Sequence, residues 1–302
     1  MTSILTNVAA MSALQTLRGI NSSLESTQGR VSSGYRVAEA KDNAAYWSIA
    51  TTMRSDNKAL SAVSDALGLG AAKVDTAYSA LDSAIDIVTE IKAKIVAATE
   101  KGVDKTKIQD EISQLQQQLL SVAQSASFSG ENWVAGNTTK SVVSSFVRDA
   151  NGEVSVKTTE YVLNDASNGN VLFGMTTSGA IDTSTGIIGT SYASVGSIFA
   201  MDITSFSVDD INLALTSVES GLSSLTKAAS QLGSISTRID LQESFVSNLS
   251  DSIDSGIGRL VDADMEEESS KLTALQTQQQ LAIQSLSIAN SSAQNVLTLF
   301  QN

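Results

Sequence analysis

The chain has 302 residues, of which 42% are hydrophobic, and a formal net charge of -13 at pH 7. It contains no cysteine, histidine or proline. This composition excludes disulfides, thiolate nucleophiles, imidazole bases and the commonest zinc ligands. The negative charge argues against a nucleic-acid partner, and no run approaches the roughly 20 apolar residues of a membrane-spanning helix. We therefore expect a largely helical, non-enzymatic protein without cofactor, metal or membrane insertion.

The first segment is predicted to be an amphipathic helix. From Ile4 to Val31 the apolar residues recur at steps of three and four, which is the spacing of one helical face. The polar face carries mostly Ser, Thr, Asn and Gln, which suits burial between like copies. Ser32-Ser33-Gly34 follows, and Gly34 is expected to end the helix in the left-handed conformation.

A much longer helix is predicted from Ala44 to about Ala98. Either Asp42 or Asn43 can cap it, and at about 1.5 Å per residue it forms a rod about 80 Å long. Gly68 and Gly70 weaken this helix locally, so we expect a partner helix to approach closely there.

A third helix follows, with Asp104 as its cap and apolar positions up to Ala126, and a short loop makes it antiparallel to the second. The pattern changes to β from about 140 to 200. There Val142–Arg148 and Val154–Val162 flank Asn151-Gly152, a strong hairpin turn signal. The remainder of this region is rich in loop residues and contains only short apolar runs.

Helical periodicity resumes at Asp209 or Asp210, either of which can cap a helix that extends to Leu260. This second long helix is the natural antiparallel partner of the first. A final helix then runs from Met265 to Phe300, and Asp264 with Glu267 is expected to cap it.

An acidic cluster surrounds the start of the final helix, at Asp262, Asp264 and Glu266 to Glu268. Carboxylates suit calcium or magnesium, but capping and complementarity to the helix dipole account better for these positions. Lys41-Asp42 is an equally weak acid/base pair, because no histidine, cysteine or evident substrate cleft accompanies it.

Two motifs carry a resemblance to a known family. Ser33-Gly34-Tyr35-Arg36 followed by Ala40 to Ala45, and the run from Arg259 to Asp264, resemble the signatures of bacterial flagellins. The resemblance covers roughly residues 1–135 and 205–302, and Ala45-Tyr46-Trp47-Ser48-Ile49-Ala50 is similar to the rhizobial type. It implies a subunit that is exported through the flagellar type III apparatus and polymerises into an extracellular helical filament for swimming. The implied partners are the chain itself, sister flagellins, the filament cap, hook-filament junction proteins and an export chaperone.

The expected fold is mainly α with a small β insertion: a long antiparallel helical-bundle rod, a two-helix terminal foot and a short β-rich outer region. The resemblance implies an inner-tube domain at 1–31 and 265–302 and a connector at 32–46 and 259–264. It likewise implies an outer-tube bundle at 47–139 and 201–258, with a reduced outer region at 140–200.

Three sets of candidate site residues follow. The predicted polymerisation contacts are Val8, Met11, Leu17, Leu24, Leu275, Leu286, Leu297 and Phe300. The predicted connector residues are Gly34, Arg36, Lys41, Asp42, Arg259, Asp262 and Asp264. By alignment, the surface that the flagellin-sensing Toll-like receptor reads falls on Glu90, Lys94 and Gln118, where one charge is reversed and a cation replaces an apolar contact, so weak or no activation is expected.

Other functional classes compete with a filament subunit. A hook-filament junction protein is similar at both ends and of similar length, but its relatives usually match the two joints less fully. A secreted coiled-coil effector or adhesin would not need these joints. An enzyme would need polar groups that the chain lacks.

Overall fold

The computed structural model describes residues 7–100, 102–149 and 152–299, with side chains of the last helix described up to position 291. The chain divides into two compact units, which comprise residues 1–58 with 251–302 and residues 59–250. Two long helices, α2 (Ala44–Ala97) and α5 (Val208–Val261), each contribute to both units. None of the described helices has an apolar stretch long enough to cross a membrane.

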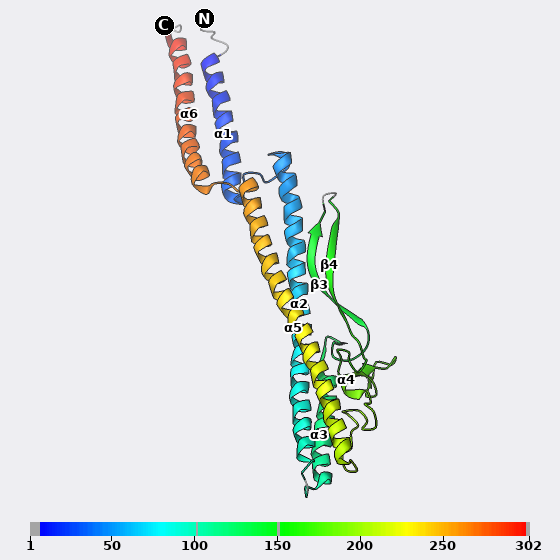
Figure 1. Cartoon of the computed structure of the whole chain (residues 1–302). Coiled ribbons are helices and arrows are strands. Elements are labelled where there is room, and N and C mark those ends of the chain that lie inside the picture. The colour runs from blue at the N-terminus through cyan, green and yellow to red at the C-terminus, as the bar shows by residue number, and fades with distance from the viewer. Residues whose placement is uncertain (1–6, 101, 150–151, 300–302) are drawn as a thin grey trace. The chain divides into compact units, whose positions relative to one another are not determined.

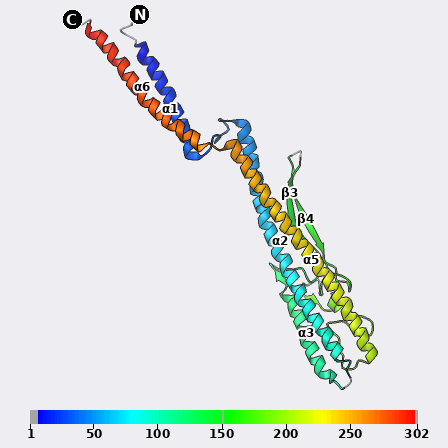
Figure 2. The same cartoon turned by 60° about the vertical axis from the view of Figure 1, so that its left-hand side comes forward.

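In the first unit, the terminal helices α1 (Val8–Ser33) and α6 (Met265–Leu299) lie side by side and run antiparallel (Figures 1 and 2). Side chains cap both starts. The Asn7 Oδ1 atom accepts a hydrogen bond from the amide of Ala10, and Asp264 Oδ1 accepts from the amide of Glu266. The predicted role of Asp264 as a cap is therefore confirmed, whereas the predicted start of the first helical stripe, at Ile4, lies outside the described residues.

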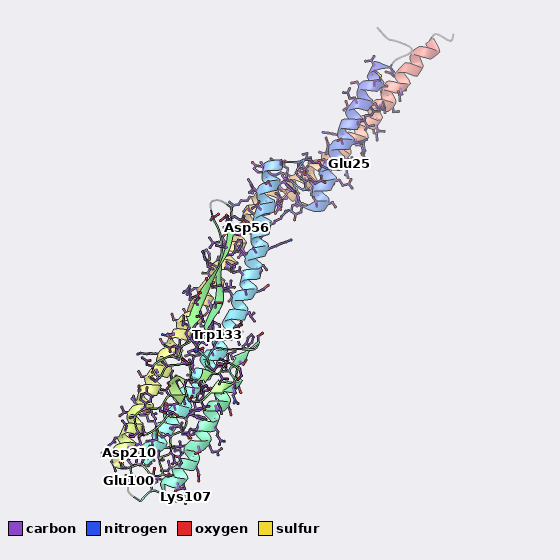
Figure 3. The ribbon with its side chains drawn as sticks, turned by 90° about the vertical axis from the view of Figure 1, so that its right-hand side faces the viewer. Glu25, Asp56, Glu100, Lys107, Trp133 and Asp210 are labelled. Carbon is purple, nitrogen blue, oxygen red and sulfur yellow. The ribbon has the colours of Figure 1, made fainter. Side chains whose placement is uncertain are left out.

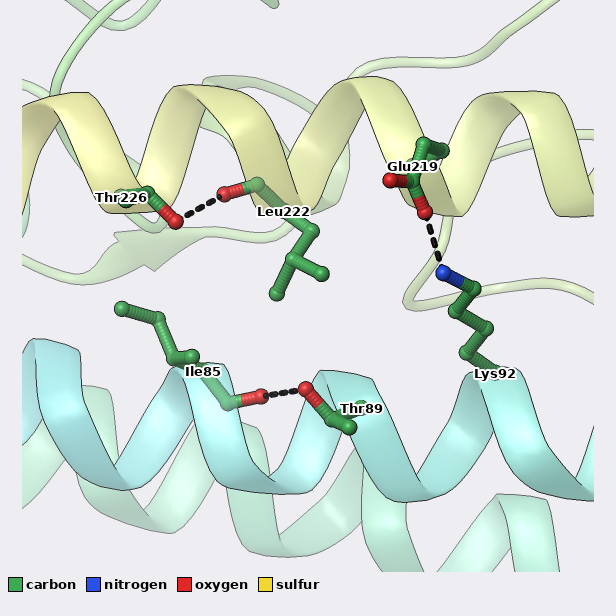
Figure 4. Close-up of polar contacts among 6 residues, drawn as sticks. All are labelled: Ile85, Thr89, Lys92, Glu219, Leu222 and Thr226. Carbon is green, nitrogen blue, oxygen red and sulfur yellow. Dashed lines mark hydrogen bonds and ion pairs between the residues drawn. The ribbon is translucent and has the colours of Figure 1, made fainter.

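In the second unit, α2, α3 (Lys105–Ser125) and α5 pack as a helical bundle whose apolar positions recur at steps of three and four. Ion pairs link the helices at the surface: Lys92 on α2 contacts Glu219 on α5 (Figure 4), and Lys94 contacts Glu111 on α3 at 2.6 Å. The fully buried side chains of this bundle include Leu67, Leu81, Ile91, Ile95, Ile112, Leu119, Leu225 and Leu232.

The β elements of the second unit form three antiparallel two-stranded sheets. They are β1 (Ser127–Phe128) with β2 (Glu131–Asn132), β3 (Thr139–Arg148) with β4 (Val154–Val162), and β5 (Gly174–Met175) with β6 (Ile181–Asp182). The β3–β4 hairpin pairs Arg148 with Val154, on either side of the predicted turn, of which Asn151 lies outside the described residues, and its register shifts between Val143 and Ser145. The mainly α fold with a small β insertion is thus confirmed.

The loop-rich segment after β4 holds its own buried core. Phe173 and Ile187, the latter on the short helix α4 (Gly186–Gly189), are fully buried, and Phe173 packs edge-on against Phe199 at 5.4 Å. The Gln116 side chain on α3 donates hydrogen bonds to the carbonyls of Ile198 and Met201. These bonds satisfy backbone groups of the loop and attach it to the bundle.

The predicted reason for Gly68 and Gly70 is wrong. A β-carbon on Gly70 would lie 2.1 Å from Val142 Cγ1, so the element that approaches this glycine is strand β3 and not a helix. A β-carbon on Gly68 would meet no atom within 4 Å. Of these two glycines, Gly70 is therefore the one at which another element approaches the helix backbone closely.

The predicted cap of α5 is also wrong. Ser207 precedes the helix and its hydroxyl accepts a hydrogen bond from the Asp210 amide at 3.3 Å, while Asp210 Oδ2 accepts from the Ser207 amide at 3.0 Å. This is a reciprocal capping box, with Ser207 at the cap and Asp210 as the side chain that reaches back. The hydrogen bonds from Ser207 lower the pKa of Asp210 below its usual value.

A polar and aromatic cluster joins α2 to the β region (Figure 3 labels Trp133). The Trp133 ring is 2% exposed and stacks on Tyr161 with ring centres 6.0 Å apart. Glu131 Oε2 accepts hydrogen bonds from Lys73 Nζ at 3.0 Å and from Trp133 Nε1 at 3.2 Å. These two bonds, with that from Lys73 the stronger, lower the pKa of Glu131, whereas burial raises the pKa of Tyr161 to about 12.

The Glu131 cluster predicts a pH-dependent contribution to stability. Because the folded-state pKa of Glu131 lies below its ordinary value of 4.5, its ionised form stabilises the fold above that pH, and the contribution is lost as pH falls through the folded-state pKa. Urea unfolding of the wild type and of Glu131→Gln, followed by Trp133 fluorescence, tests this. The difference in unfolding free energy should be constant near pH 7 and should shrink below pH 4.5; a difference that does not change with pH contradicts the assignment.

Candidate assembly site on the terminal helices and the connector

The contact between α1 and α6 is a heptad seam. Half-buried or buried positions recur at steps of three and four on each helix, so the two apolar stripes face one another. The α1 stripe comprises Ala10, Ala13, Leu17, Ile20, Leu24, Thr27 and Val31, and the α6 stripe comprises Glu268, Leu272, Leu275, Gln279, Ala282, Leu286 and Ala289. Leu17, Leu24, Leu275 and Leu286 of the predicted contact set thus lie on the intramolecular seam.

Polar contacts fix the register of this seam along its length. Near one end the Asn7 side chain donates to the Ala289 carbonyl at 3.0 Å, and midway the Gln279 side chain donates to Asn21 Oδ1 at 2.7 Å. At the other end Arg30 Nη1 contacts Glu268 Oε1 at 3.1 Å. Polar contacts at three levels hold the helices in one alignment.

Glu268 is a site residue that sequence reasoning missed. In the sequence, Glu268 belongs to the acidic first turn of the last helix. In the structure its side chain faces Arg30 on α1 and is only 8% exposed. Its Oε2 atom is buried with no hydrogen-bond partner among the described residues, so the carboxylate relies on Arg30. The available signal was its spacing, because position 268 continues the stripe of Leu272 and Leu275 by one heptad step.

The outer faces of the terminal helices expose a second apolar set. Ile288 is 69% exposed and Val8 is 66% exposed. Both residues lie in segments that contain no charged residue. Large apolar side chains on a charge-free surface indicate an area that another molecule covers. The exposed set is Val8, Met11, Leu14, Leu281, Ile283 and Ile288. Of the predicted contacts, Val8 and Met11 belong to it, and Phe300 and the side chain of Leu297 lie outside the described residues.

The connector consists of two strands that pair across Tyr35 and Asp262. The amides of Arg36 and Val37 both donate to the Val261 carbonyl, and the Ala263 amide donates to the Gly34 carbonyl at 2.9 Å. Beneath them Val37 and Val261 are buried in a small apolar cluster with Ala50 and Ile257, against which Met53, Ile253 and Leu260 pack. Backbone pairing and this cluster hold the two connector strands together.

The predicted connector side chains act mostly on the backbone. Arg36 Nη2 donates to the carbonyls of Arg259 and Leu260, and Asp42 Oδ2 accepts from the amides of Ala38 and Glu39. Lys41 pairs with the neighbouring Glu39 at 2.8 Å. The hydrogen bonds from the loop amides lower the pKa of Asp42. Asn43, and not Asp42, caps α2, because its Oδ1 atom accepts from the Tyr46 amide.

Gly34 has the left-handed conformation that its sequence context predicts, with φ 75° and ψ 1°, and its amide donates to the Arg30 carbonyl at 2.8 Å. No atom lies within 4 Å of a β-carbon built there, so only the backbone conformation restricts the residue. We expect Gly34→Val to lose about 1–2 kcal/mol of local stability and Gly34→Asn to lose clearly less, since Asn tolerates this conformation. Amide hydrogen exchange of the connector in assembled material measures the effect, and equal protection in both variants contradicts it.

The predicted receptor-evasion positions lie in the second unit. Glu90 and Gln118 are exposed, on α2 and α3. Lys94 is half-buried and pairs with Glu111, and the hydrogen bond that Lys94 donates to the Glu111 carboxylate raises the pKa of Lys94. Its charge is therefore partly neutralised within the chain.

No group of three or more aspartate or glutamate residues within the described part of the chain is placed to hold a metal ion. Asp264 caps α6, and Glu268 pairs with Arg30.

Comparison with known proteins identifies the family. Residues 4–139 match the bacterial flagellin N-terminal helical region, and residues 215–300 match the bacterial flagellin C-terminal helical region. Flagellin C and Flagellin B of Rhizobium meliloti (strain 1021) are 55% and 57% identical to the chain, and the flagellin of Brucella melitensis biotype 1 is 47% identical. Each alignment covers all of both chains. The predicted resemblance is confirmed, and the chain belongs to the bacterial flagellin family.

Proposed function

We propose that this chain is a structural subunit of an extracellular bacterial flagellar filament and serves swimming motility. The observation that carries the proposal is the first unit: α1 and α6 cover one stripe on each other and leave a second apolar set exposed on charge-free segments. A single pair of helices cannot bury apolar residues on both sides, so other copies must cover the outer set. Contacts of this kind that do not close into a ring generate a helical polymer.

Each segment of the chain is assigned the structural role that the corresponding segment has in the flagellin family. Residues 1–31 and 265–302 form the inner tube, and residues 32–46 with 259–264 form the connector. Residues 47–139 and 201–258 form the outer tube, and residues 140–200 are what remains of an outer domain. Support comes from the separate apolar core of the second unit, which does not depend on the exposed set of the terminal helices.

The finer partners follow from the same proposal. The subunit passes through the flagellar type III apparatus with an export chaperone and assembles beneath the filament cap onto the hook-filament junction. Its partners in the filament are further copies of the chain and sister flagellins. The chain acts structurally and not as an enzyme. Its polymerisation contacts include Val8 and Met11 of the exposed set.

Negative-stain microscopy and mass spectrometry of sheared cell-surface material test the function. Long filaments made mainly of this chain are expected, and they should disappear when its gene is deleted and return on complementation. A trace of the chain confined to one end of the filament contradicts the proposal and supports a junction protein.

Receptor evasion is proposed for Glu90, Lys94 and Gln118. Glu90 and Gln118 are exposed, and the pairing of Lys94 with Glu111 places charge where the stimulating relatives present an apolar contact. Purified monomer is expected to give little or no signal in receptor reporter cells. Strong signalling at nanomolar monomer refutes the proposal, and a stimulating flagellin serves as the positive control.

A further inference from the structure

The first turns of α2 expose three large apolar side chains. Tyr46 is 42% exposed, Trp47 is 37% exposed and Ile49 is 48% exposed. They lie just after the Asn43 cap in the first compact unit. We call Tyr46, Trp47 and Ile49 the aromatic patch.

The aromatic patch adjoins the small apolar cluster of the connector. Tyr46 and Trp47 precede the buried Ala50 by four and three residues, and Ile49 precedes Met53 by four. Side chains at these spacings are neighbours on one side of a helix, so the patch continues the apolar surface of the cluster towards the helix start. Four buried residues make up that cluster, which is too few to enclose an additional tryptophan and tyrosine.

The charges around the patch favour a second copy of the chain as its partner. Residues 43–53 contain no charged side chain, whereas the whole chain has a net charge of -13. Copies that repel each other overall approach at least cost where both surfaces are uncharged. Tryptophan and tyrosine are also the residues most enriched at the centres of protein interfaces.

We propose that the aromatic patch is a contact between subunits, in which Tyr46, Trp47 and Ile49 pack against an apolar surface of a neighbouring copy. This inference rests on the proposed function and adds to it a contact surface at the start of α2, separate from the exposed set of α1 and α6. The patch and the terminal helices belong to the same compact unit, so one subunit offers apolar surfaces at more than one place.

The chain contains two tryptophans, which makes the contact measurable. Trp47 is 37% exposed in the single chain, whereas Trp133 is 2% exposed within the second unit and serves as an internal reference. Fluorescence emission and acrylamide quenching are compared in monomer and filament for the wild type and for Trp47→Phe. Wild-type filaments should show a blue shift and at least a twofold fall in the quenching of the Trp47 component, and Trp47→Phe should show neither.

A second pair of variants tests whether the contact contributes to assembly. Trp47→Lys places a charge in the patch, and Ser55→Lys places the same charge at an exposed polar position two turns further along α2. Trp47→Lys should raise the monomer concentration needed for polymerisation about tenfold, while Ser55→Lys should change it less than twofold. Circular dichroism of both monomers verifies that the helices are intact.

The outcomes separate this inference from the proposed function. If the wild-type chain forms filaments while Trp47 stays as accessible to acrylamide as in the monomer, the aromatic patch is not a subunit contact and the function stands. Burial of Trp47 only after a different flagellar protein is added likewise overturns the second copy as occupant. If the wild-type chain forms no filaments, the proposed function itself fails.

Discussion

Deleting residues 290–302 is expected to abolish polymerisation while the monomer remains soluble and helical. The deleted segment lies in the charge-free stretch that extends from Leu272 to the end of the chain, and it includes the last part of α6. The reason for the expected loss is that contacts among copies in a helical lattice are repeated at every subunit, so removing one weakens all layers together. The core of the second unit is formed within residues 59–250 and does not include the deleted segment.

Sedimentation and negative-stain microscopy measure the loss, at concentrations where the full-length chain converts completely to filaments. The control is the urea midpoint of the second unit, reported by Trp133, which should be the same in both chains. Adding sheared wild-type filaments as seeds distinguishes slow nucleation from the absence of contacts, because seeds should not rescue growth of the truncated chain. Filaments of normal length from the truncated chain mean that the terminal helices have been assigned the wrong role.

The long helices were predictable because their periodicity is uninterrupted. The predicted second helix, from Ala44 to about Ala98, ends within one residue of the observed α2, Ala44–Ala97. The β3–β4 hairpin was predictable because an Asn-Gly pair, here Asn151-Gly152, strongly favours a tight turn when it lies between two β-rich runs. Both signals are local, and neither depends on which distant residues pack against them.

What the sequence could not provide were partners that lie far apart along the chain. A glycine within a helix can indicate that another element approaches its backbone closely, but the sequence does not identify that element. For Gly70 the approaching residue is Val142 on strand β3. Arg30 and Glu268 are likewise joined only by the fold, because 238 positions separate them. The cap at Ser207 was missed for a different reason. Ser and Asp can both cap a helix, so residue type alone does not distinguish Ser207 from Asp210. The three-residue spacing between them is the signal of a capping box in which the serine is the cap.

The short apolar runs of the loop-rich segment were also underestimated. Val171-Leu172-Phe173 and Ile187-Ile188 are too short to show periodicity, yet all five residues are fully buried. Their backbones approach each other closely, since the amides of Ile187 and Ile188 donate to the carbonyls of Val171 and Leu172 at 3.0 Å and 3.1 Å. Close backbone contact of this kind requires a residue without a side chain at the point of crossing.

Gly186 occupies that point, and replacing it with alanine is expected to destabilise the second unit strongly. Its φ is +90°, and a β-carbon would lie 2.6 Å from both the Leu172 carbonyl oxygen and the Phe173 Cα atom. Backbone atoms cannot rotate away as a flexible side chain can. The left-handed conformation costs about 1–2 kcal/mol for alanine and overpacking adds about 1–3 kcal/mol, so a loss of about 3 kcal/mol is expected.

Gly179→Ala is the matched control for Gly186→Ala. Gly179 has nearly the same φ, +83°, but no atom lies within 4 Å of a β-carbon built there, so only the conformational cost of about 1–2 kcal/mol applies. Urea unfolding of both variants in a Trp47→Phe background, followed by Trp133 fluorescence, gives the two free energies directly. Because the conformational cost is common to both, the difference between them isolates the crowding by Leu172 and Phe173. Equal losses in the two variants contradict that crowding and leave the left-handed backbone as the sole reason for glycine at position 186.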